Sequence, residues 1–265
     1  MKKIYLLVFV LLVAGCNTVP LTGRKQFTAI PVSQMLSLSN QSYNQVLQQS
    51  NVSSNSSTLR EIRQVGNRVT DAVERYLLQI GRSELIDGYK WEYNLINEDI
   101  MNAWCMPGGK IAFYEGILPV CKNDNGIAVV MAHEISHALA KHGNERMSQQ
   151  LALQLGGMAL SEALKQKSET TMQLAMTAFG LGSQIGVILP YSRSHEKEAD
   201  ELGLYFMAMA GYDPREAPEF WQRMQAASQG AGTPEFLSTH PNPEKRINHL
   251  ERIMPKAMEY YNANN

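Results

Sequence analysis

The residues best placed to do chemistry are two histidines four positions apart, with a glutamate beside the first, in the motif His133-Glu134-x-x-His137. In a helix, this spacing puts both imidazoles on one face, where they can bind one metal ion. Glu134 is turned about 100° from His133, so its carboxylate can reach a metal-bound water without binding the metal. The motif therefore predicts a zinc hydrolase. The alternative is a core helix, in which the two histidines and the glutamate would need buried polar partners.

A hydrolytic zinc site needs a third protein ligand and leaves its fourth position to water. His142 would lie on the opposite side of a continuous helix, so we predict that it is solvated. A second expected helix, residues 192–211, carries Glu196 and Asp200 one turn apart. One carboxylate can bind the metal while the other hydrogen-bonds a ligand imidazole. Spacing does not choose between Glu196 and Glu198, and an acidic helical run is otherwise usually a solvated face.

The expected elements around these residues are mostly helices, with strands only before the metal motif. Apolar spacing predicts helices, alternation predicts short strands, and Asn123 or Asp124 can cap the metal helix. The fold class is therefore α+β and mostly helical, with a small β-hairpin or antiparallel sheet next to the metal-binding helix. The predicted helices are 34–49 and 59–80, and the predicted strands are 89–96, 103–106 and 110–114.

The hairpin at residues 101–114 has two possible roles. An edge strand beside the metal can hold a substrate backbone by strand addition, which lets a protease bind a chain without depending on its sequence. The other possibility is a plain hairpin in the core. The sequence leaves both open.

The N-terminus predicts export and lipid attachment. Residues 1–15 have the charged start and short apolar core of a signal peptide, too short to span a membrane stably. They end at Val13-Ala14-Gly15-Cys16, which resembles the lipobox of bacterial lipoproteins; an ordinary signal with an incidental cysteine is the alternative. We expect a lipid-anchored tether at 16–33 and one peptidase domain at 34–265, with membrane contact through Cys16.

Composition restricts the partners. The net charge is −1 with no basic block, so nucleic acid is not an expected partner.

The state of two cysteines and of one uncharged segment is left open by the sequence. Cys105 and Cys121 are either buried thiols or a disulfide, and an exported protein slightly favours the disulfide. Residues 170–192 carry no charge; we expect a buried or membrane-facing helix rather than a spanning one, because polar residues and glycines dilute the segment.

Four groups of residues match one family pattern. They are Asn102-Ala103 with Pro107-Gly108-Gly109-Lys110-Ile111, His133-Glu134-Ile135-Ser136-His137, Ser192-Arg193 with Glu196 and Ala199-Asp200, and Ser238-Thr239-His240-Pro241. On these residues the chain, from about Leu21 to Ile253, resembles the minigluzincin zinc metallopeptidases of the Ste24, HtpX and Oma type. It is most similar to their bacterial periplasmic lipoprotein branch (BepA- and LoiP-like), without the tetratricopeptide extension of the BepA proteins.

The resemblance implies a zincin-like catalytic domain and assigns individual roles. His133, His137 and Glu196 would bind one zinc ion, Glu134 would be the general base, and Asp200 would hold a ligand histidine. His240 would lie over the metal, either assisting the reaction or blocking the water position; without the resemblance it would be taken as structural. Arg246, His249 and His195 are expected at helix surfaces or in packing.

We therefore expect a zinc-dependent endopeptidase that acts on exposed or misfolded envelope proteins in protein quality control. The resemblance implies a location at the periplasmic face of the outer membrane. One alternative is a lipid-anchored chaperone or assembly factor with latent catalysis, against which the intact Glu134 argues. A second is hydrolysis of a non-peptide envelope substrate, such as a peptidoglycan stem peptide.

Overall fold

The computed structural model describes residues 16–19, 22–184, 188–228 and 234–264. The predicted signal peptide, residues 1–15, lies outside them. The chain forms two compact units, the smaller from Met1–Val32 and Lys141–Glu196 and the larger from Ser33–Ala140 and Lys197–Asn265. Helix α8 (Leu189–Met209) contributes its first part to the smaller unit and its second part to the larger one.

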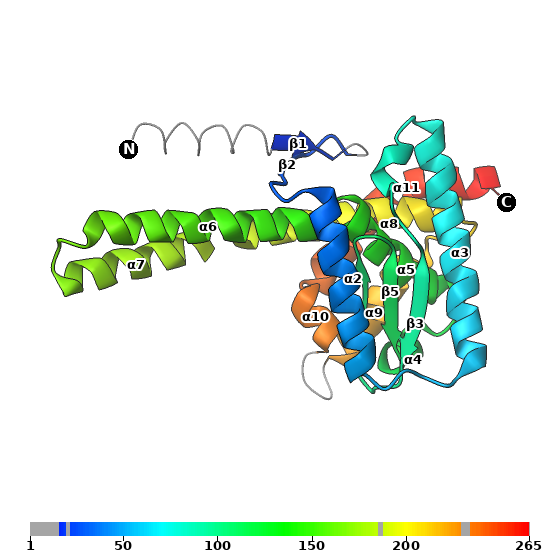
Figure 1. Ribbon diagram of the computed structural model, residues 1–265. Coiled ribbons are helices and arrows are strands. Elements are labelled where there is room, and N and C mark those ends of the chain that lie inside the picture. Colours follow the sequence, from blue (N-terminus) through cyan, green and yellow to red (C-terminus); the bar gives the residue numbers. More distant parts are fainter. Residues whose placement is uncertain (1–15, 20–21, 185–187, 229–233, 265) are drawn as a thin grey trace. The chain divides into compact units, whose positions relative to one another are not determined.

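The larger unit contains a three-stranded sheet with the order β3-β5-β4 (Figure 1). β4 (Ala103–Met106) and β5 (Lys110–Tyr114) form the predicted antiparallel hairpin, with Gly108 and Gly109 both at positive φ in its turn. β3 (Glu92–Ile96) pairs with β5 in parallel, so the sheet is mixed. β4 pairs only with β5 within this sheet, which makes it an edge strand.

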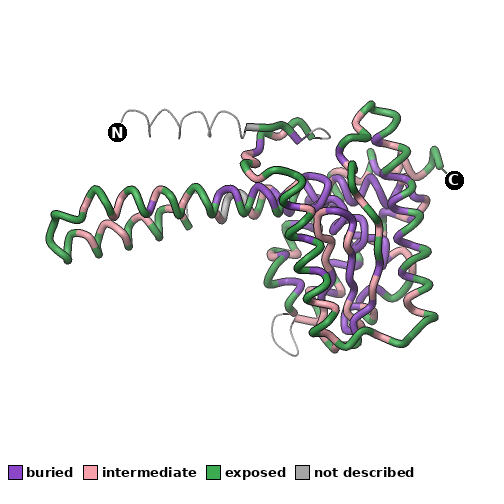
Figure 2. The backbone as a smooth tube through the Cα atoms, in the orientation of Figure 1, coloured by how far each residue is buried: buried purple, intermediate pink, exposed green. Residues whose placement is uncertain are grey.

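The helices of the larger unit cover this sheet. α3 (Ser56–Gln79) has the predicted amphipathic spacing, and the Asn55 side chain caps it by accepting from the Thr58 N–H. α5 (Asp124–Leu139) packs on β4 and on α3, and its residues from Gly126 to Leu139 are buried, including the polar residues of the metal motif (Figure 2). The remaining bounds are α2 (Val32–Gln49), η1 (Ser83–Ile86), η2 (Glu115–Ile117), α4 (Leu118–Cys121), α9 (Glu216–Ala227), α10 (Glu235–Thr239) and α11 (Pro243–Asn264).

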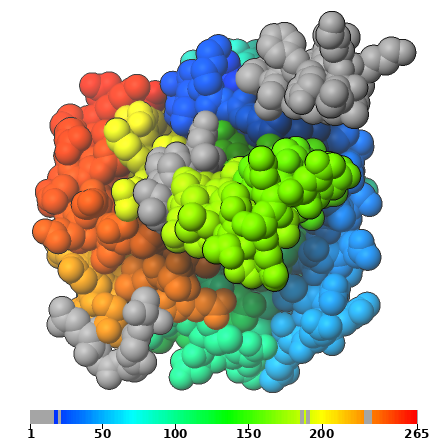
Figure 3. Space-filling view, turned by 90° about the vertical axis from the view of Figure 1, so that its left-hand side faces the viewer, coloured from blue at the N-terminus to red at the C-terminus, as the bar shows by residue number. Residues whose placement is uncertain are grey.

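The smaller unit combines a short hairpin with a long helical one. β1 (Cys16–Thr18) pairs antiparallel with β2 (Lys25–Phe27), and β2 packs on α6 (His142–Leu164). The segment predicted as a tether therefore contains ordered structure. α6 and α7 (Glu169–Ser183) pack against each other and are coloured green to yellow-green in Figure 3.

Two expectations for this unit are wrong. The metal helix does not continue through Lys141 towards solvent: Lys141 takes a left-handed conformation with φ 56°, α6 starts anew, and His142 is completely buried. For residues 170–192, the buried alternative is wrong for α7, since none of its residues is buried; the membrane-facing alternative stays a prediction. Among the helices of the described residues, none combines the length and apolarity needed to cross a membrane.

Candidate metal centre

α5 brings the two motif histidines together as predicted for a helix. The Asn123 side chain caps its start by accepting from the Gly126 N–H. His133 and His137 follow one turn apart, both buried, with 3.0 Å between their Nε2 atoms. Tetrahedral zinc, with Zn–N distances of about 2.0–2.1 Å, would place two ligand nitrogens about 3.3–3.4 Å apart, so a small shift of the rings would let them share one ion.

His240 adds a third imidazole from the end of α10. Its Nδ1 lies 3.3 Å from His133 Nε2, and its Nε2 lies 3.4 Å from a carboxylate oxygen of Glu134. Ring nitrogens of His133, His137 and His240 all lie within 4.8 Å of one another, and all three residues are buried. Imidazole nitrogens are ligands that zinc prefers, so these residues fit the expected metal. The same contacts place His240 beside the predicted general base.

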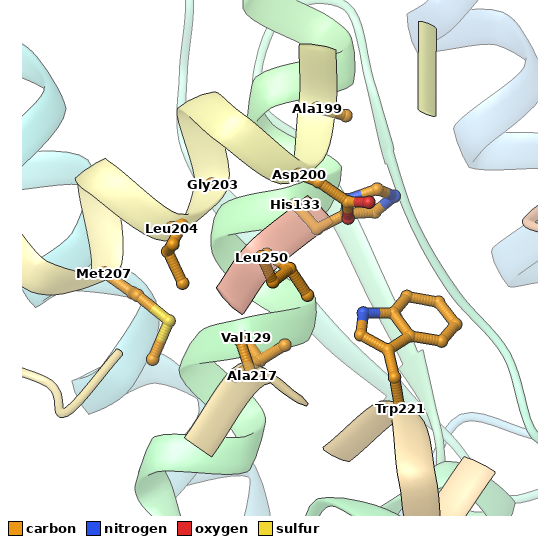
Figure 4. A pocket seen from close by; sticks show the side chains of 10 residues that line it. All are labelled: Val129, His133, Ala199, Asp200, Gly203, Leu204, Met207, Ala217, Trp221 and Leu250. Atoms are coloured by element: carbon orange, nitrogen blue, oxygen red, sulfur yellow. The ribbon is translucent and has the colours of Figure 1, made fainter. Parts of the chain in front are cut away.

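Asp200 on α8 turns its carboxylate towards His133 (Figure 4), with Oδ1 3.3 Å from Nδ1 of the ring. This partner favours the tautomer that carries its proton on Nδ1 and leaves the Nε2 lone pair for a metal. Burial alone would raise the pKa of Asp200, but the Arg246 guanidinium and the hydrogen bond with His133 lower it below its ordinary value. Asp200 is therefore ionised at neutral pH.

Arg246 on α11 is the part of this cluster that sequence reasoning missed. Its Nε donates to Asp200 Oδ2 at 2.8 Å and its Nη2 pairs with Oδ1. Nη2 also lies 3.0 Å from Nδ1 and 3.1 Å from Nε2 of His133, so it would have to move aside for a metal on Nε2. Its guanidinium stacks over the Trp221 ring, 3.6 Å from the ring centre. One sequence signal was available: Leu250 follows four residues later, so Arg246 lies on the apolar, inward face of its helix.

α8 and α5 approach closely at Gly203. A Cβ on this residue would lie 3.0 Å from both the N and the Cα of His133, so a larger residue would have to push the two helix backbones slightly apart. The cavity that Asp200, His133 and Trp221 border has a volume of only about 10 Å³ (Figure 4). That is room for about one water molecule, so this cavity is part of the packing behind the site rather than a place for a substrate.

Glu196 lies on the same helix as Asp200, one turn earlier, and is buried. Helical periodicity turns both carboxylates to the same side of α8. The role of Glu196 as the third metal ligand stays a prediction.

The two cysteines are free thiols, so the disulfide that we slightly favoured is wrong. Cys105 lies in β4 and Cys121 at the end of α4. Burial, followed by the negative charge of Glu134, raises the pKa of Cys105, and burial also raises the pKa of Cys121. Both are therefore protonated at neutral pH and poor nucleophiles.

Comparison with known proteins agrees with this chemistry. Residues 64–254 match the sequence profile of Peptidase family M48. The chain is 31% identical to the mitochondrial metalloendopeptidase OMA1 of Schizosaccharomyces pombe, over 90% of this chain and 66% of that protein. The chain is 30% identical to OMA1 of Saccharomyces cerevisiae, over 95% of this chain and 75% of that protein. This chain is also 32% identical to the β-barrel assembly-enhancing protease of Escherichia coli, over 64% of this chain and 36% of that protein.

Proposed function

Since this chain belongs to peptidase family M48 and is a metalloendopeptidase, we propose that it is a zinc enzyme that cleaves exposed segments of unfolded or misfolded envelope proteins. The observation that carries the proposal is the convergence of His133 and His137 next to Glu134, with Asp200 against His133. The ligands that we propose are His133, His137 and Glu196. Zinc would supply the Lewis acid that polarises the scissile carbonyl and acidifies water.

The protein's own groups would move the protons. Glu134 would take a proton from the attacking water and deliver it to the leaving amine, as a general base and then a general acid. Asp200 would fix the orientation and basicity of His133 through the Nδ1 hydrogen bond. No covalent intermediate is needed, and the two protonated cysteines are not suited to form one.

β4 is our proposed binding site for the substrate backbone. It is an edge strand, it packs on α5, and Trp104, Cys105 and Met106 are half-buried along it. An extended chain could add to this edge through main-chain hydrogen bonds, which would explain selection of unfolded segments. At its start, the Phe236 N–H donates to the Met101 carbonyl oxygen at 2.9 Å, which ties α10 and hence His240 to the same edge.

The proposed location is the periplasmic face of the outer membrane, with a lipid on Cys16. The lipobox-like sequence supports this, and so does the relative from Escherichia coli whose name refers to β-barrel assembly. A chemical test is direct: mass spectrometry of the protein purified from membranes should find acyl chains on an N-terminal Cys16. An N-terminus at any other residue would contradict the proposal.

Replacing Glu134 tests the mechanism. Glu134→Gln should retain zinc, measured by metal analysis, but lose cleavage of unfolded casein by a factor of about 10²–10⁴, because the proton acceptor is removed. A chelator should abolish cleavage by the wild type. Glu219→Gln, the same change at an exposed position in α9, is the matched control and should stay active. Casein cleavage by Glu134→Gln at the wild-type rate would overturn the mechanism.

The contacts of His240 favour one second candidate, a chaperone with latent catalysis. Its imidazole lies beside both His133 and Glu134 and could occupy the position that the attacking water needs. In that case the wild type should suppress aggregation of unfolded protein without cleaving it, and His240→Ala should gain cleavage. If His240 assists the reaction instead, His240→Ala should lose cleavage.

A further inference from the structure

We propose that Arg24, Glu145 and His195 form an N-terminal clasp that positions Glu196 for metal binding. The clasp joins the segment after the predicted lipid attachment site to the helix that carries Glu196. This inference rests on the proposed function, because it takes Glu196 as a zinc ligand. The three residues are positioning residues, and all of them lie in the smaller unit.

Glu145 is the centre of the clasp and is fully buried. Arg24 binds it in a bidentate manner, with Nη1 3.2 Å from Oε1 and Nη2 2.8 Å from Oε2. His195 Nε2 lies 2.9 Å from Oε2. Burial alone would raise the pKa of Glu145, but the hydrogen bonds with His195 and Arg24 lower it. The carboxylate is therefore a fixed negative charge that holds two cationic or polar partners from distant parts of the chain.

Backbone contacts align the N-terminal segment with α6. The Phe27 N–H donates to Glu145 Oε1 at 3.3 Å, and the Ala29 N–H donates to Ser148 Oγ at 2.8 Å. The Asn144 side chain donates to the Ile30 carbonyl oxygen at 2.7 Å. Through the pairing of Cys16 with Phe27 in the β1–β2 hairpin, the predicted lipid site lies next to the first of these contacts.

The His195 ring is held on its flat side as well as at its edge. It stacks on His142, with 4.2 Å between ring centres and an interplanar angle of 14°, and both rings are buried. Burial is the main cause that lowers the pKa of His142, so this partner is neutral. Edge and face contacts together leave His195 little freedom. The next residue in α8 is Glu196, so fixing His195 also fixes the helix backbone from which Glu196 projects.

Stability alone is a weak explanation of this arrangement. An ion pair buried in this way gains little over apolar packing of similar volume, because each charge must first lose its water. A carboxylate network next to a metal ligand has a better-attested use, which is to orient that ligand. His195 was expected at a helix surface or in packing; its partners and its place before Glu196 argue for orientation.

Two variants break the clasp at different points. His195→Phe keeps a ring to stack on His142 but removes the nitrogen that contacts Glu145, while Arg24 still neutralises that carboxylate. Arg24→Gln removes the other partner and leaves His195. We expect each full-length variant to bind zinc about 10–100-fold more weakly than the wild type, measured with zinc alone against a competing chelator. kcat for casein should fall while KM stays nearly constant, because the substrate site is not altered.

Conservative and matched variants separate positioning from stability. His195→Gln keeps a donor for Glu145 and should recover most of the zinc affinity. Arg82→Gln removes an exposed arginine from its pair with Glu84 and should change nothing. If His195→Phe does not fold, Arg24→Gln decides the matter, because Arg24 is 21% exposed and water can take its place.

The outcomes distinguish this inference from the proposed function. Glu196→Gln should lose zinc. Suppose that Glu196→Gln loses zinc, while folded His195→Phe and Arg24→Gln melt at a lower temperature but bind zinc as tightly as the wild type. The clasp is then only structural, and the inference is wrong. If Glu196→Gln keeps both zinc and activity, the proposed ligand set is wrong instead.

Discussion

Both units contain a buried cluster of one arginine, one carboxylate and one histidine. In the larger unit these are Arg246, Asp200 and His133, here termed the ligand cluster. In the smaller unit they are the residues of the N-terminal clasp. In both clusters the arginine binds the carboxylate through two nitrogens, and the carboxylate contacts a ring nitrogen of the histidine. The same chemical pattern thus occurs twice.

The clusters differ in how near their histidine is to the proposed metal and in their access to water. His133 is itself a proposed ligand, whereas His195 only precedes one. The Arg246 side chain is 4% exposed and stacks on Trp221; the Arg24 side chain is 21% exposed and extends from a hairpin. Under the proposed ligand set, the ligand cluster would orient His133 directly, where water is excluded, and the clasp would orient Glu196 through His195, in a partly solvated segment.

Removing Arg246 should give the largest difference between the clusters. Arg246→Gln would leave the Asp200 carboxylate buried without its main counter-charge, and breaking such a pair costs about 3–5 kcal/mol. Urea unfolding of the metal-free protein measures this loss. Arg24→Gln should cost less, about 1–3 kcal/mol, because water reaches that site and His195 still contacts Glu145. Equal losses in the two variants would remove the distinction that we draw.

Replacing Gly203 tests whether the ligand cluster also depends on close helix packing. Alanine would favour the helix by about 1 kcal/mol over glycine. Its Cβ would nevertheless meet the backbone of His133 at 3.0 Å, and overpacking of this kind costs about 1–3 kcal/mol. We expect Gly203→Ala to lower the melting temperature and weaken zinc binding.

The matched control is Gly180 in α7, where a Cβ would meet nothing within 4 Å. Gly180→Ala should therefore leave zinc binding unchanged and stabilise its helix slightly. If Gly203→Ala is as stable as Gly180→Ala and binds zinc normally, the close approach of α8 and α5 does not matter for the site.

Acid should weaken the ligand cluster through Asp200. The pKa of this carboxyl is lower in the folded protein than its ordinary value of about 4, so below pH 4 the unfolded chain binds more protons. The stabilisation is complete above pH 4 and is lost as the pH falls through the native-state pKa. In the metal-free protein, the stability gap between wild type and Asp200→Asn should shrink by about 1.4 kcal/mol per pH unit over that range. A gap independent of pH would show that Asp200 is not preferentially ionised in the fold.

Local signals in the sequence predicted much of the fold. The amphipathic spacing of α3, the cap of α5, the hairpin of β4 and β5, and the one-turn spacing of the two motif histidines all depend on residues close in sequence. The fold class and the metalloendopeptidase activity are confirmed. The parallel pairing of β3 with β5 was not predicted, because the chain must cross over before the two strands meet and no local signal records that.

Two of the differences between sequence and structure come from features that no local pattern records. Arg246 lies 46 residues from Asp200, so only tertiary packing reveals their pairing. His142 was predicted as solvated because a continuous helix was assumed, but Lys141 ends that continuity with a left-handed backbone that favours glycine and gives no sequence warning. The roles of Glu196, Asp200 and His240 stay predictions, because they depend on the bound metal.

Trp221 should show the smallest effect, and it tests whether the aromatic stack contributes to the ligand cluster. Tryptophan binds a cation over its face more strongly than phenylalanine, so Trp221→Phe should weaken the contact with Arg246 and cost about 1 kcal/mol. A double-mutant cycle with Arg246→Gln should give a coupling energy of similar size, measured by urea unfolding. The same cycle with Arg82→Gln, at an exposed ion pair, should give no coupling energy. Without coupling between Trp221 and Arg246, the aromatic ring only fills space, and exclusion of water alone would distinguish the ligand cluster from the clasp.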